Sequence, residues 1–176
     1  NGISPIFTSV KGEALKVLKT VFGYDDFRPQ QWDIIKEVLD DRDALALMPT
    51  GGGKSLCFQI PALLKEGAAI VVSPLIALMK DQVEGLVSNG VKATFLNSSQ
   101  SPEEQDRVMR ELEAGMIKML YVSPEKLVND HFLSFLQTIK ISLIAIDEAH
   151  CISSWGHDFR PEYAQVGALR HRFEGV

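Results

Sequence analysis

The sequence has few cysteines, no long hydrophobic run and no excess of positive charge. Its 176 residues include two cysteines, and neither belongs to a C-x-x-C pair, so we expect both thiols to be reduced. No apolar run approaches the roughly 18 residues of a membrane-spanning helix, and the first residues lack the charged-then-apolar pattern of a secretion signal. These absences predict a cytoplasmic protein without membrane contact, associated with the nucleoid if its source is bacterial.

The charge balance argues against one way of binding nucleic acid. The chain carries 18 Lys and Arg against 23 Asp and Glu, which gives a net charge of −5. A protein that binds nucleic acid through a broad basic surface is therefore not expected. Any contact with a phosphate backbone should be local and sensitive to salt.

The length and composition fit one soluble globular domain. Hydrophobic residues make up 45% of the chain and charged residues 23%, which is ordinary for such a domain. A chain of this size buries about 70% of its unfolded surface, so it needs no disulfide or metal to be stable. We expect a single domain over residues 1–176, with residues 1–10 partly disordered because they carry few structural signals.

The most informative stretch is Met48–Ser55, with the sequence MPTGGGKS. It follows the apolar run 44–47, which we predict to be the first strand, and precedes a helix-like stretch, 56–64. Three successive glycines let backbone N–H groups converge on phosphate oxygens, and the helix adds its positive end. Lys54 would then reach the β and γ phosphates, and the Ser55 hydroxyl would bind Mg²⁺. The strict pattern has Gly in place of Met48, and the alternative is a glycine-rich turn, in which each Gly costs about 1 kcal/mol relative to Ala.

After this loop the chain alternates between strand-like and helix-like segments. The strand-like runs are almost entirely apolar, which is typical of a parallel sheet covered by helices on both faces. We therefore predict an open α/β fold whose ligands bind at the C-terminal ends of the strands. Pro61 should bend or end the helix after the loop near Ile60. The predicted strands are 68–72, 93–96, 119–122 and 143–146, and the predicted helices are 11–22, one that follows 23–31, and then 75–88, 102–114 and 124–137.

Three Ser-Pro pairs, which begin at Ser73, Ser101 and Ser123, precede predicted helices. Serine is a good N-cap and proline suits the first helical position, so all three serines are expected to be caps. Glu104 is placed to complete a capping box with Ser101. A further hypothesis is that the helices after Ser73 and Ser123 open at the same sheet edge as the phosphate loop and bind phosphates of an extended polyanion.

The last predicted strand runs into Asp147-Glu148-Ala149-His150. A carboxylate at the end of a buried strand beside a phosphate loop is placed to bind Mg²⁺, and Glu148 can then orient an attacking water. A solvated acidic turn is the alternative.

The loop that follows has aromatic residues between polar ones, and Trp155 and Phe159 are either a small satellite core or surfaces for stacking on bases. His150 and Cys151 form no recognised zinc pattern.

With these motifs assembled, the chain resembles the RecQ family of DNA helicases from about Lys11 to Phe173. In that family Met48 is usual in the phosphate loop, and the run from Asp147 to Tyr163 is specific to RecQ proteins among helicases. The matching motifs are Phe22-Gly23-Tyr24, Phe27-Arg28-Pro29-x-Gln31, Met48–Ser55, Val72-Ser73-Pro74-Leu75, Leu78-Met79-Lys80-Asp81-Gln82, Ser123-Pro124-Glu125 and the run that starts at Asp147.

The resemblance implies a RecA-like domain of an enzyme that uses ATP and Mg²⁺ to unwind duplex DNA with 3′→5′ polarity, in DNA repair and recombination. It gives Tyr24 the role of stacking on adenine, while Arg28 and Gln31 recognise the edge of the base. It gives the loop 153–163 the role of sensing single-stranded DNA, with His150 passing the signal to the nucleotide. The implied catalytic residues are Lys54, Asp147, Glu148 and His150, and the implied metal ligands are Ser55 and Asp147. The implied nucleotide contacts are Tyr24, Phe27, Arg28, Gln31, Thr50, Gly51, Gly52, Gly53, Lys54 and Ser55. The implied DNA contacts are Ser73, Lys80, Ser123, Trp155, His157, Phe159 and Arg160.

The sequence stops at Val176, just before the place where the resemblance predicts a Thr-Ala-Thr segment and a second RecA-like domain. That second domain would supply an arginine to the nucleotide site, so the chain alone is expected to be a monomer that hydrolyses ATP very slowly. Single-stranded and partly duplex DNA are the expected partners. Three alternatives remain: an RNA helicase of a related class, a phosphate-loop enzyme acting on small molecules, and a non-catalytic nucleotide-binding module.

Overall fold

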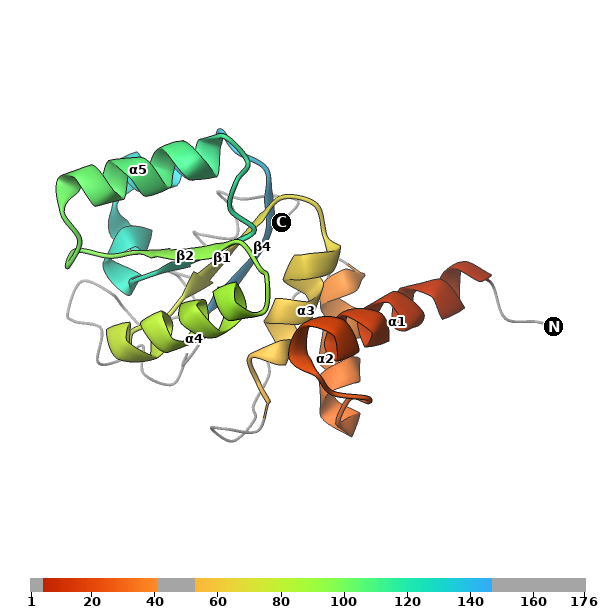
Figure 1. The fold of residues 1–176 in the computed structure, drawn as a ribbon. Helices are drawn as coiled ribbons and strands as arrows, with labels where there is room; N and C mark the ends of the chain where they lie inside the picture. Colours follow the sequence, from red (N-terminus) through yellow and green to blue (C-terminus); the bar gives the residue numbers. More distant parts are fainter. Residues whose placement is uncertain (1–4, 41–52, 147–176) are drawn as a thin grey trace. The chain divides into compact units, whose positions relative to one another are not determined.

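The computed structural model describes residues 5–40 and 53–146 and divides the chain into two compact units. Unit 1 is Asn1–Lys65 and unit 2 is Glu66–Val176, and each is described by itself (Figure 1). Unit 1 is helical in its described part, whereas unit 2 contains a sheet with helices on it.

The described part of unit 1 contains three α-helices: α1 (Pro5–Val17), α2 (Pro29–Leu39) and α3 (Leu56–Leu64). A π-helical turn, η1 (Leu18–Phe22), continues α1 and ends at a glycine in the left-handed conformation. The predicted helix 11–22 is thus confirmed, although it begins at Pro5, within the stretch that has few sequence signals. The three helices share one apolar core, formed by Ala14, Leu18, Ile35, Leu56 and Ile60.

The prediction for Pro61 is wrong in one respect, because α3 does not end near Ile60. The helix continues to Leu64, and the N–H of Lys65 donates to the Pro61 carbonyl at 2.9 Å. Proline inside a helix removes one hydrogen bond and costs about 3 kcal/mol. Here Pro61 is buried together with Ile60 and Ala62, and this packing offsets the cost.

Unit 2 is built on a four-stranded parallel sheet with the strand order β2-β3-β1-β4. The strands are β1 (Ala68–Val72), β2 (Ala93–Leu96), β3 (Met119–Val122) and β4 (Ile141–Ile146). All four were expected from apolar runs. The last begins two residues earlier than predicted because Ile141 also pairs with β1, at Ala68, before the register shifts. The run 44–47, predicted as a further strand, lies outside the described residues.

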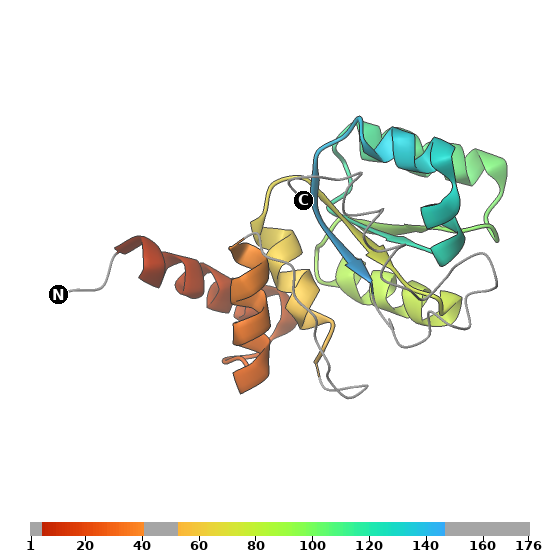
Figure 2. The same ribbon diagram turned by 180° about the vertical axis from the view of Figure 1, so that it is seen from behind.

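Helices cover both faces of this sheet, as the apolar strands require. Figures 1 and 2 show α4 (Ile76–Ser88) on one face, and α5 (Pro102–Glu113) and α6 (Asp130–Leu136) on the other. The core under α5 and α6 includes Ile70, Val72, Leu96, Val108, Leu112, Leu120, Val122, Phe132, Leu133 and Leu136.

The predicted helix 124–137 is in fact two elements. A 3₁₀ turn, η2 (Pro124–Val128), precedes α6, and Asn129 separates them. The Asn129 side chain accepts the N–H of Phe132 at 3.0 Å, which is an N-cap that starts a new helix.

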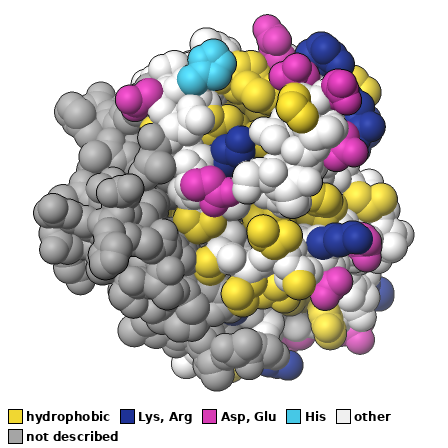
Figure 3. All heavy atoms as spheres, turned by 90° about the vertical axis from the view of Figure 1, so that its left-hand side faces the viewer, with side chains coloured by type: hydrophobic (Ala, Val, Ile, Leu, Met, Phe, Trp, Pro, Cys, Tyr) yellow, Lys and Arg dark blue, Asp and Glu magenta, His cyan; other side chains and the backbone are white. Residues whose placement is uncertain are grey.

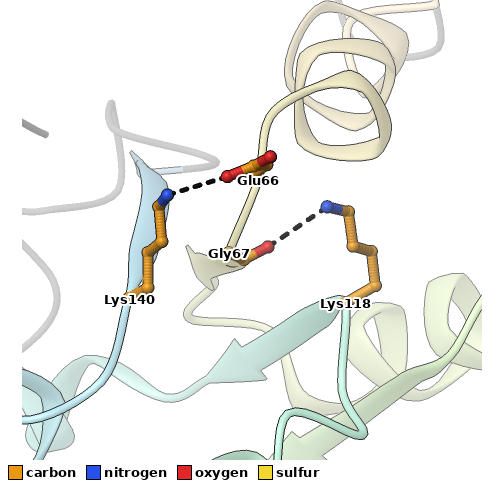
Figure 4. A network of polar contacts seen from close by, with 4 residues as sticks. All are labelled: Glu66, Gly67, Lys118 and Lys140. Atoms are coloured by element: carbon orange, nitrogen blue, oxygen red, sulfur yellow. Dashed lines mark hydrogen bonds and ion pairs between the residues drawn. The ribbon is translucent and has the colours of Figure 1, made fainter.

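Polar contacts join the beginnings of three neighbouring strands (Figure 4). Lys140 Nζ lies 2.9 Å from Glu66 Oε2, and Lys118 Nζ donates to the Gly67 carbonyl at 3.2 Å. The hydrogen bond from Lys140 lowers the pKa of Glu66, whereas partial burial lowers the pKa of Lys118 against the opposing attraction of Glu66. Gly67 has φ +102°, and a Cβ there would lie 2.7 Å from the Lys140 carbonyl oxygen.

We predict that Gly67→Ala lowers the free energy of unfolding by about 3 kcal/mol, because it adds a steric clash to an unfavourable φ. Gly90→Ala is the matched control, since Gly90 has φ +86° but nothing within 4 Å of the added Cβ. The control should lose only about 1–2 kcal/mol. Urea unfolding followed by circular dichroism measures both, and equal losses would contradict the packing argument.

Candidate nucleotide-binding site

The segment between η1 and α2 contains one exposed aromatic ring and one that packs against another ring. Gly23, at φ 77°, ends the helical turn and Tyr24 follows it with 57% of its surface exposed. Phe27 instead stacks on Trp32, with ring centroids 5.7 Å apart and an interplanar angle of 22°. Tyr24 is therefore accessible for stacking on a base, whereas the described contacts of Phe27 are those of core packing.

The beginning of α2 is fixed by Gln31. Arg28 has the extended conformation that a following proline favours, and Pro29 occupies the first helical position. Gln31 Oε1 accepts the backbone N–H of Arg28 at 2.9 Å, which is the returning half of a capping box. This bond holds the Gln31 side chain at the N-terminus of α2, where it is 3% exposed.

The other end of the Gln31 amide contacts the phosphate loop. Gln31 Nε2 donates to the Gly53 carbonyl at 3.0 Å, across 22 positions of sequence. The same carbonyl accepts the N–H of Leu56 at 3.2 Å as α3 begins. Two segments that the sequence singles out separately, 27–31 and the end of 48–55, are thus joined by a hydrogen bond.

Gly53 is suited to this contact for two reasons. Its φ of +79° is one that L-residues rarely adopt. A Cβ on Gly53 would also lie 2.3 Å from Gln31 Nε2, so any side chain would displace the glutamine. The sequence explains this glycine by its approach to phosphate, and the structure adds the approach of Gln31.

Lys54 and Ser55 directly precede α3, whose N-terminus is anchored in the core by Leu56 and Ile60. Backbone N–H groups at a helix N-terminus, an ammonium group and a hydroxyl are the donors and ligand that a magnesium-bound triphosphate requires. The chemistry of these residues therefore fits the predicted nucleotide. Thr50, Gly51 and Gly52 lie outside the described residues.

In unit 2, two serines lie side by side where their strands end. Val72 pairs with Val122, and the N–H of Ser73 donates to the Val122 carbonyl at 3.0 Å. Ser73 is 1% exposed and Ser123 is 2% exposed. Within the described part of the chain, neither hydroxyl has a hydrogen-bond partner. Both serines thus lie at one edge of the sheet, and the hypothesis that the phosphate loop lies at this edge too stays a prediction.

The predicted roles of these serines as caps are corrected by the structure. Leu75, rather than Ser73, is the N-cap of α4, because the bond to Val122 keeps Ser73 in line with its strand. Ser123 stands at the N-cap of η2, but its side chain makes no cap hydrogen bond. Ser101 does cap α5, since its Oγ accepts the N–H of Glu104 at 3.2 Å.

The remaining predicted site residues divide into described and undescribed ones. Lys80 is exposed on α4. Ile146 pairs with Val72, so β4 reaches the same edge as Ser73. The described residues contain no cluster of three or more metal-binding side chains. The acidic and DNA-sensing residues lie outside the described residues: Asp147, Glu148, His150, Trp155, His157, Phe159 and Arg160.

Figure 3 views the molecule from the side on which these strands end. Hydrophobic side chains are spread over the described surface there, and most Lys and Arg side chains lie beside Asp and Glu side chains. The described part of this face is thus without a broad basic patch.

Comparison with known proteins assigns the chain to a family. Residues 28–174 match the DEAD/DEAH box helicase family. The chain belongs to this family. The matched range contains Arg28, Gln31 and the whole phosphate loop, whereas Tyr24 precedes it.

The identities to individual relatives confirm the predicted resemblance to RecQ proteins. The chain is 54% identical over 172 residues to the ATP-dependent DNA helicase RecQ of Haemophilus influenzae, covering 97% of this chain and 28% of that protein. It is 54% identical to the RecQ of Pasteurella multocida over 93% of this chain and 26% of that protein, and 50% identical to that of Bacillus subtilis over 89% and 27%. The chain thus spans about a quarter of the length of these relatives.

A solved structure supports the helicase fold. The crystal structure of DUF1998 helicase MrfA bound to DNA and AMPPNP aligns with a TM-score of 0.63 at 23% identity, covering 80% of this chain and 21% of that one. At this identity the likeness concerns the fold, which is RecA-like α/β as predicted. Among the described residues, no helix is long and apolar enough to cross a membrane.

We predict that Gly53→Ala lowers the affinity of the chain for Mg²⁺-ATP at least ~10-fold, because it strains the loop and expels Gln31 from its bond. Isothermal titration calorimetry measures the affinity. Gly115→Ala is the control, because Gly115 also has a positive φ, 75°, but an added Cβ would meet nothing within 4 Å. Equal affinities for Gly53→Ala and the native chain would contradict the prediction.

Proposed function

We propose that this chain is the ATP-binding motor domain of a RecQ-like DNA helicase, which couples ATP hydrolysis to 3′→5′ translocation on single-stranded DNA and to duplex unwinding. The observation that carries the proposal is the bond from Gln31 to Gly53, which joins the base-recognition segment to the phosphate loop. The similarity to RecQ proteins over nearly the whole chain supports it. The proposed protein acts in the cytoplasm, as a monomer.

In the proposed site, Tyr24 stacks on adenine, and Arg28 and Gln31 face the edge of the base. The glycine loop and the N-terminus of α3 hold the phosphates, and Lys54 neutralises charge on the β and γ phosphates. Mg²⁺ bound by Ser55 and Asp147 would supply further charge stabilisation. Glu148 accepts a proton from the attacking water and orients it.

The proposed DNA contacts follow the ends of β1 and β3. The Ser73 and Ser123 hydroxyls lack partners among the described residues, and because they are buried they reach a phosphate only when the ends of β1 and β3 rearrange on binding. The N-terminus of α4 begins three residues after Ser73. Hydroxyls and helix N-termini are common ligands of backbone phosphates. Lys80 adds one positive charge on α4, and stacking by Trp155 and Phe159 would contribute about 1–3 kcal/mol per base.

The chain by itself is proposed to be nearly inactive. A RecQ-like helicase needs a second RecA-like domain whose arginine completes the nucleotide site, and loss of such an arginine costs about 10³–10⁵ in rate. The chain covers about a quarter of the length of its RecQ relatives, and the remaining three quarters are long enough to contain such a domain.

We predict that extending the chain through the next domain raises its ATPase rate by at least ~10³-fold in the presence of single-stranded DNA. In the extended protein, Lys54→Ala should abolish turnover, and Trp155→Ala should mainly weaken the stimulation by DNA. A coupled ATPase assay with and without DNA measures this. Full DNA-stimulated turnover by the 176-residue chain would refute the need for a second domain, and stronger stimulation by RNA would favour an RNA helicase.

A second prediction distinguishes the effect of Ser73 and Ser123 on the stability of the protein from their effect on DNA binding. The double variant Ser73→Ala, Ser123→Ala should be more stable, by about 1–3 kcal/mol, because it removes buried unpaired hydroxyls. The extended protein carrying it should bind single-stranded DNA about 5-fold more weakly. Fluorescence anisotropy and thermal unfolding measure the two effects.

Ser142→Ala is the matched control for this experiment. Ser142 is 4% exposed, and its hydroxyl also lacks a partner within the described residues, but it lies near the beginning of β4 rather than at the end of a strand. The Ser142→Ala variant should be more stable than the native protein, and its affinity for DNA should be unchanged. Unchanged DNA affinity of the double variant would remove Ser73 and Ser123 from the proposed DNA contacts.

A further inference from the structure

We infer that Gln31 is a positioning residue for the phosphate loop, and that it acts on bound phosphates whether or not a base is present. This inference rests on the proposed function only in taking the loop to be a phosphate site. It differs from the role that the RecQ resemblance implies, in which Gln31 recognises the edge of adenine.

Both ends of the Gln31 amide are already bonded to the protein. The oxygen accepts the N–H of Arg28 at 2.9 Å, and the nitrogen donates to the Gly53 carbonyl at 3.0 Å. The side chain is 3% exposed. A primary amide has two N–H groups and two acceptor sites, so one of each is still available for a base. The two bonds to the protein are therefore compatible with base recognition and exist without it.

The bond to Gly53 acts at a point where the loop becomes helix. The Gly53 carbonyl accepts Gln31 Nε2 and the N–H of Leu56 together, and Leu56 is the first residue of α3. Because Gly53 has no Cβ, the amide approaches the backbone directly. The bond consequently fixes the orientation of the peptide group between Gly53 and Lys54, which carries one of the N–H groups that face a bound phosphate at a helix N-terminus.

Helices α2 and α3, which flank this bond, also pack against each other. Ile35 of α2 lies in one apolar core with Leu56 and Ile60 of α3. Gln31 is in the first turn of α2, so its position is set by the cap and by this core. A loop end that is held before the ligand arrives loses less conformational entropy on binding. Removal of Gln31 should therefore weaken binding of any ligand that uses the phosphate loop.

The first test uses a ligand without a base. Calorimetry compares Mg²⁺-ATP with inorganic Mg²⁺-tripolyphosphate on the 176-residue chain, on Gln31→Ala and on Tyr24→Ala. Loss of one hydrogen bond corresponds to about 3- to 10-fold in affinity, so Gln31→Ala should weaken both ligands by at least ~3-fold. Tyr24→Ala, which removes an exposed ring, should weaken ATP alone. Unchanged tripolyphosphate affinity in Gln31→Ala would overturn the inference and leave Gln31 as a base contact.

The second test needs no ligand and so distinguishes failure of this inference from failure of the proposed function. Hydrogen–deuterium exchange is measured on the ligand-free native chain, on Gln31→Ala and on Gln31→Glu. Gln31→Glu keeps the oxygen that accepts from Arg28 but loses the donor to Gly53, so it separates the cap from the loop contact. Both variants should increase exchange at Leu56 and Cys57 by at least ~5-fold, while exchange in β1 stays the same.

Unchanged exchange at Leu56 and Cys57 in both variants would overturn the inference whatever the calorimetry shows. If the native chain binds neither ATP nor tripolyphosphate, the proposed nucleotide site fails, and the exchange data still decide whether Gln31 positions the loop. A general loss of structure in Gln31→Ala would appear as increased exchange throughout α2 and α3. In that case the exchange of Gln31→Glu, which retains the cap, decides whether the bond to Gly53 holds the loop.

Discussion

Burial of both faces of the sheet is the constraint on which the architecture of unit 2 depends. Four strands that are almost entirely apolar cannot leave one face in water, so helices must cover both. A helix between successive parallel strands is the connection that does this, and it returns the chain to the same starting edge each time. Every strand therefore ends at one edge, which is why Ser73 and Ser123 become neighbours.

One contact within unit 1 depends on a much smaller feature, the missing side chain of Gly53. Without it, an amide from α2 approaches the loop backbone closely enough to bond with it. The cap of one helix and the start of another are thereby held by a single side chain, Gln31. Through this hydrogen bond, a residue distant in sequence from the loop contacts the backbone at its end.

Much of the fold could be predicted from the sequence because its signals are local. Runs of almost entirely apolar residues identified all four strands of the described sheet, and helical spacing identified α1 and α2. The errors arose where a tertiary contact overrode a local preference. Ser73 has the sequence of a cap, but its N–H is used by the neighbouring strand. Pro61 usually ends a helix, but here the surrounding core keeps the helix intact.

The candidate site was predicted less completely, for the same reason. The pattern Gly-Lys-Ser marks the loop, and resemblance to RecQ proteins identified Gln31, but no local pattern reveals that the two are in contact. Hydrogen bonds across 22 residues of sequence depend on how helices pack. The unpaired hydroxyls of Ser73 and Ser123 were equally hidden, since a buried polar group has no signature in sequence.

The strand order has a consequence for how the protein is made. β1 lies between β3 and β4, and both of these neighbours are encoded after it. On a ribosome that adds ~5–20 residues per second, roughly 50 residues must follow β1 before β3 exists, so the backbone N–H and C=O groups of this apolar strand wait several seconds for their partners. An unpaired apolar strand is prone to aggregate. The nascent chain therefore passes through a period in which neither edge of β1 is covered by its final neighbour.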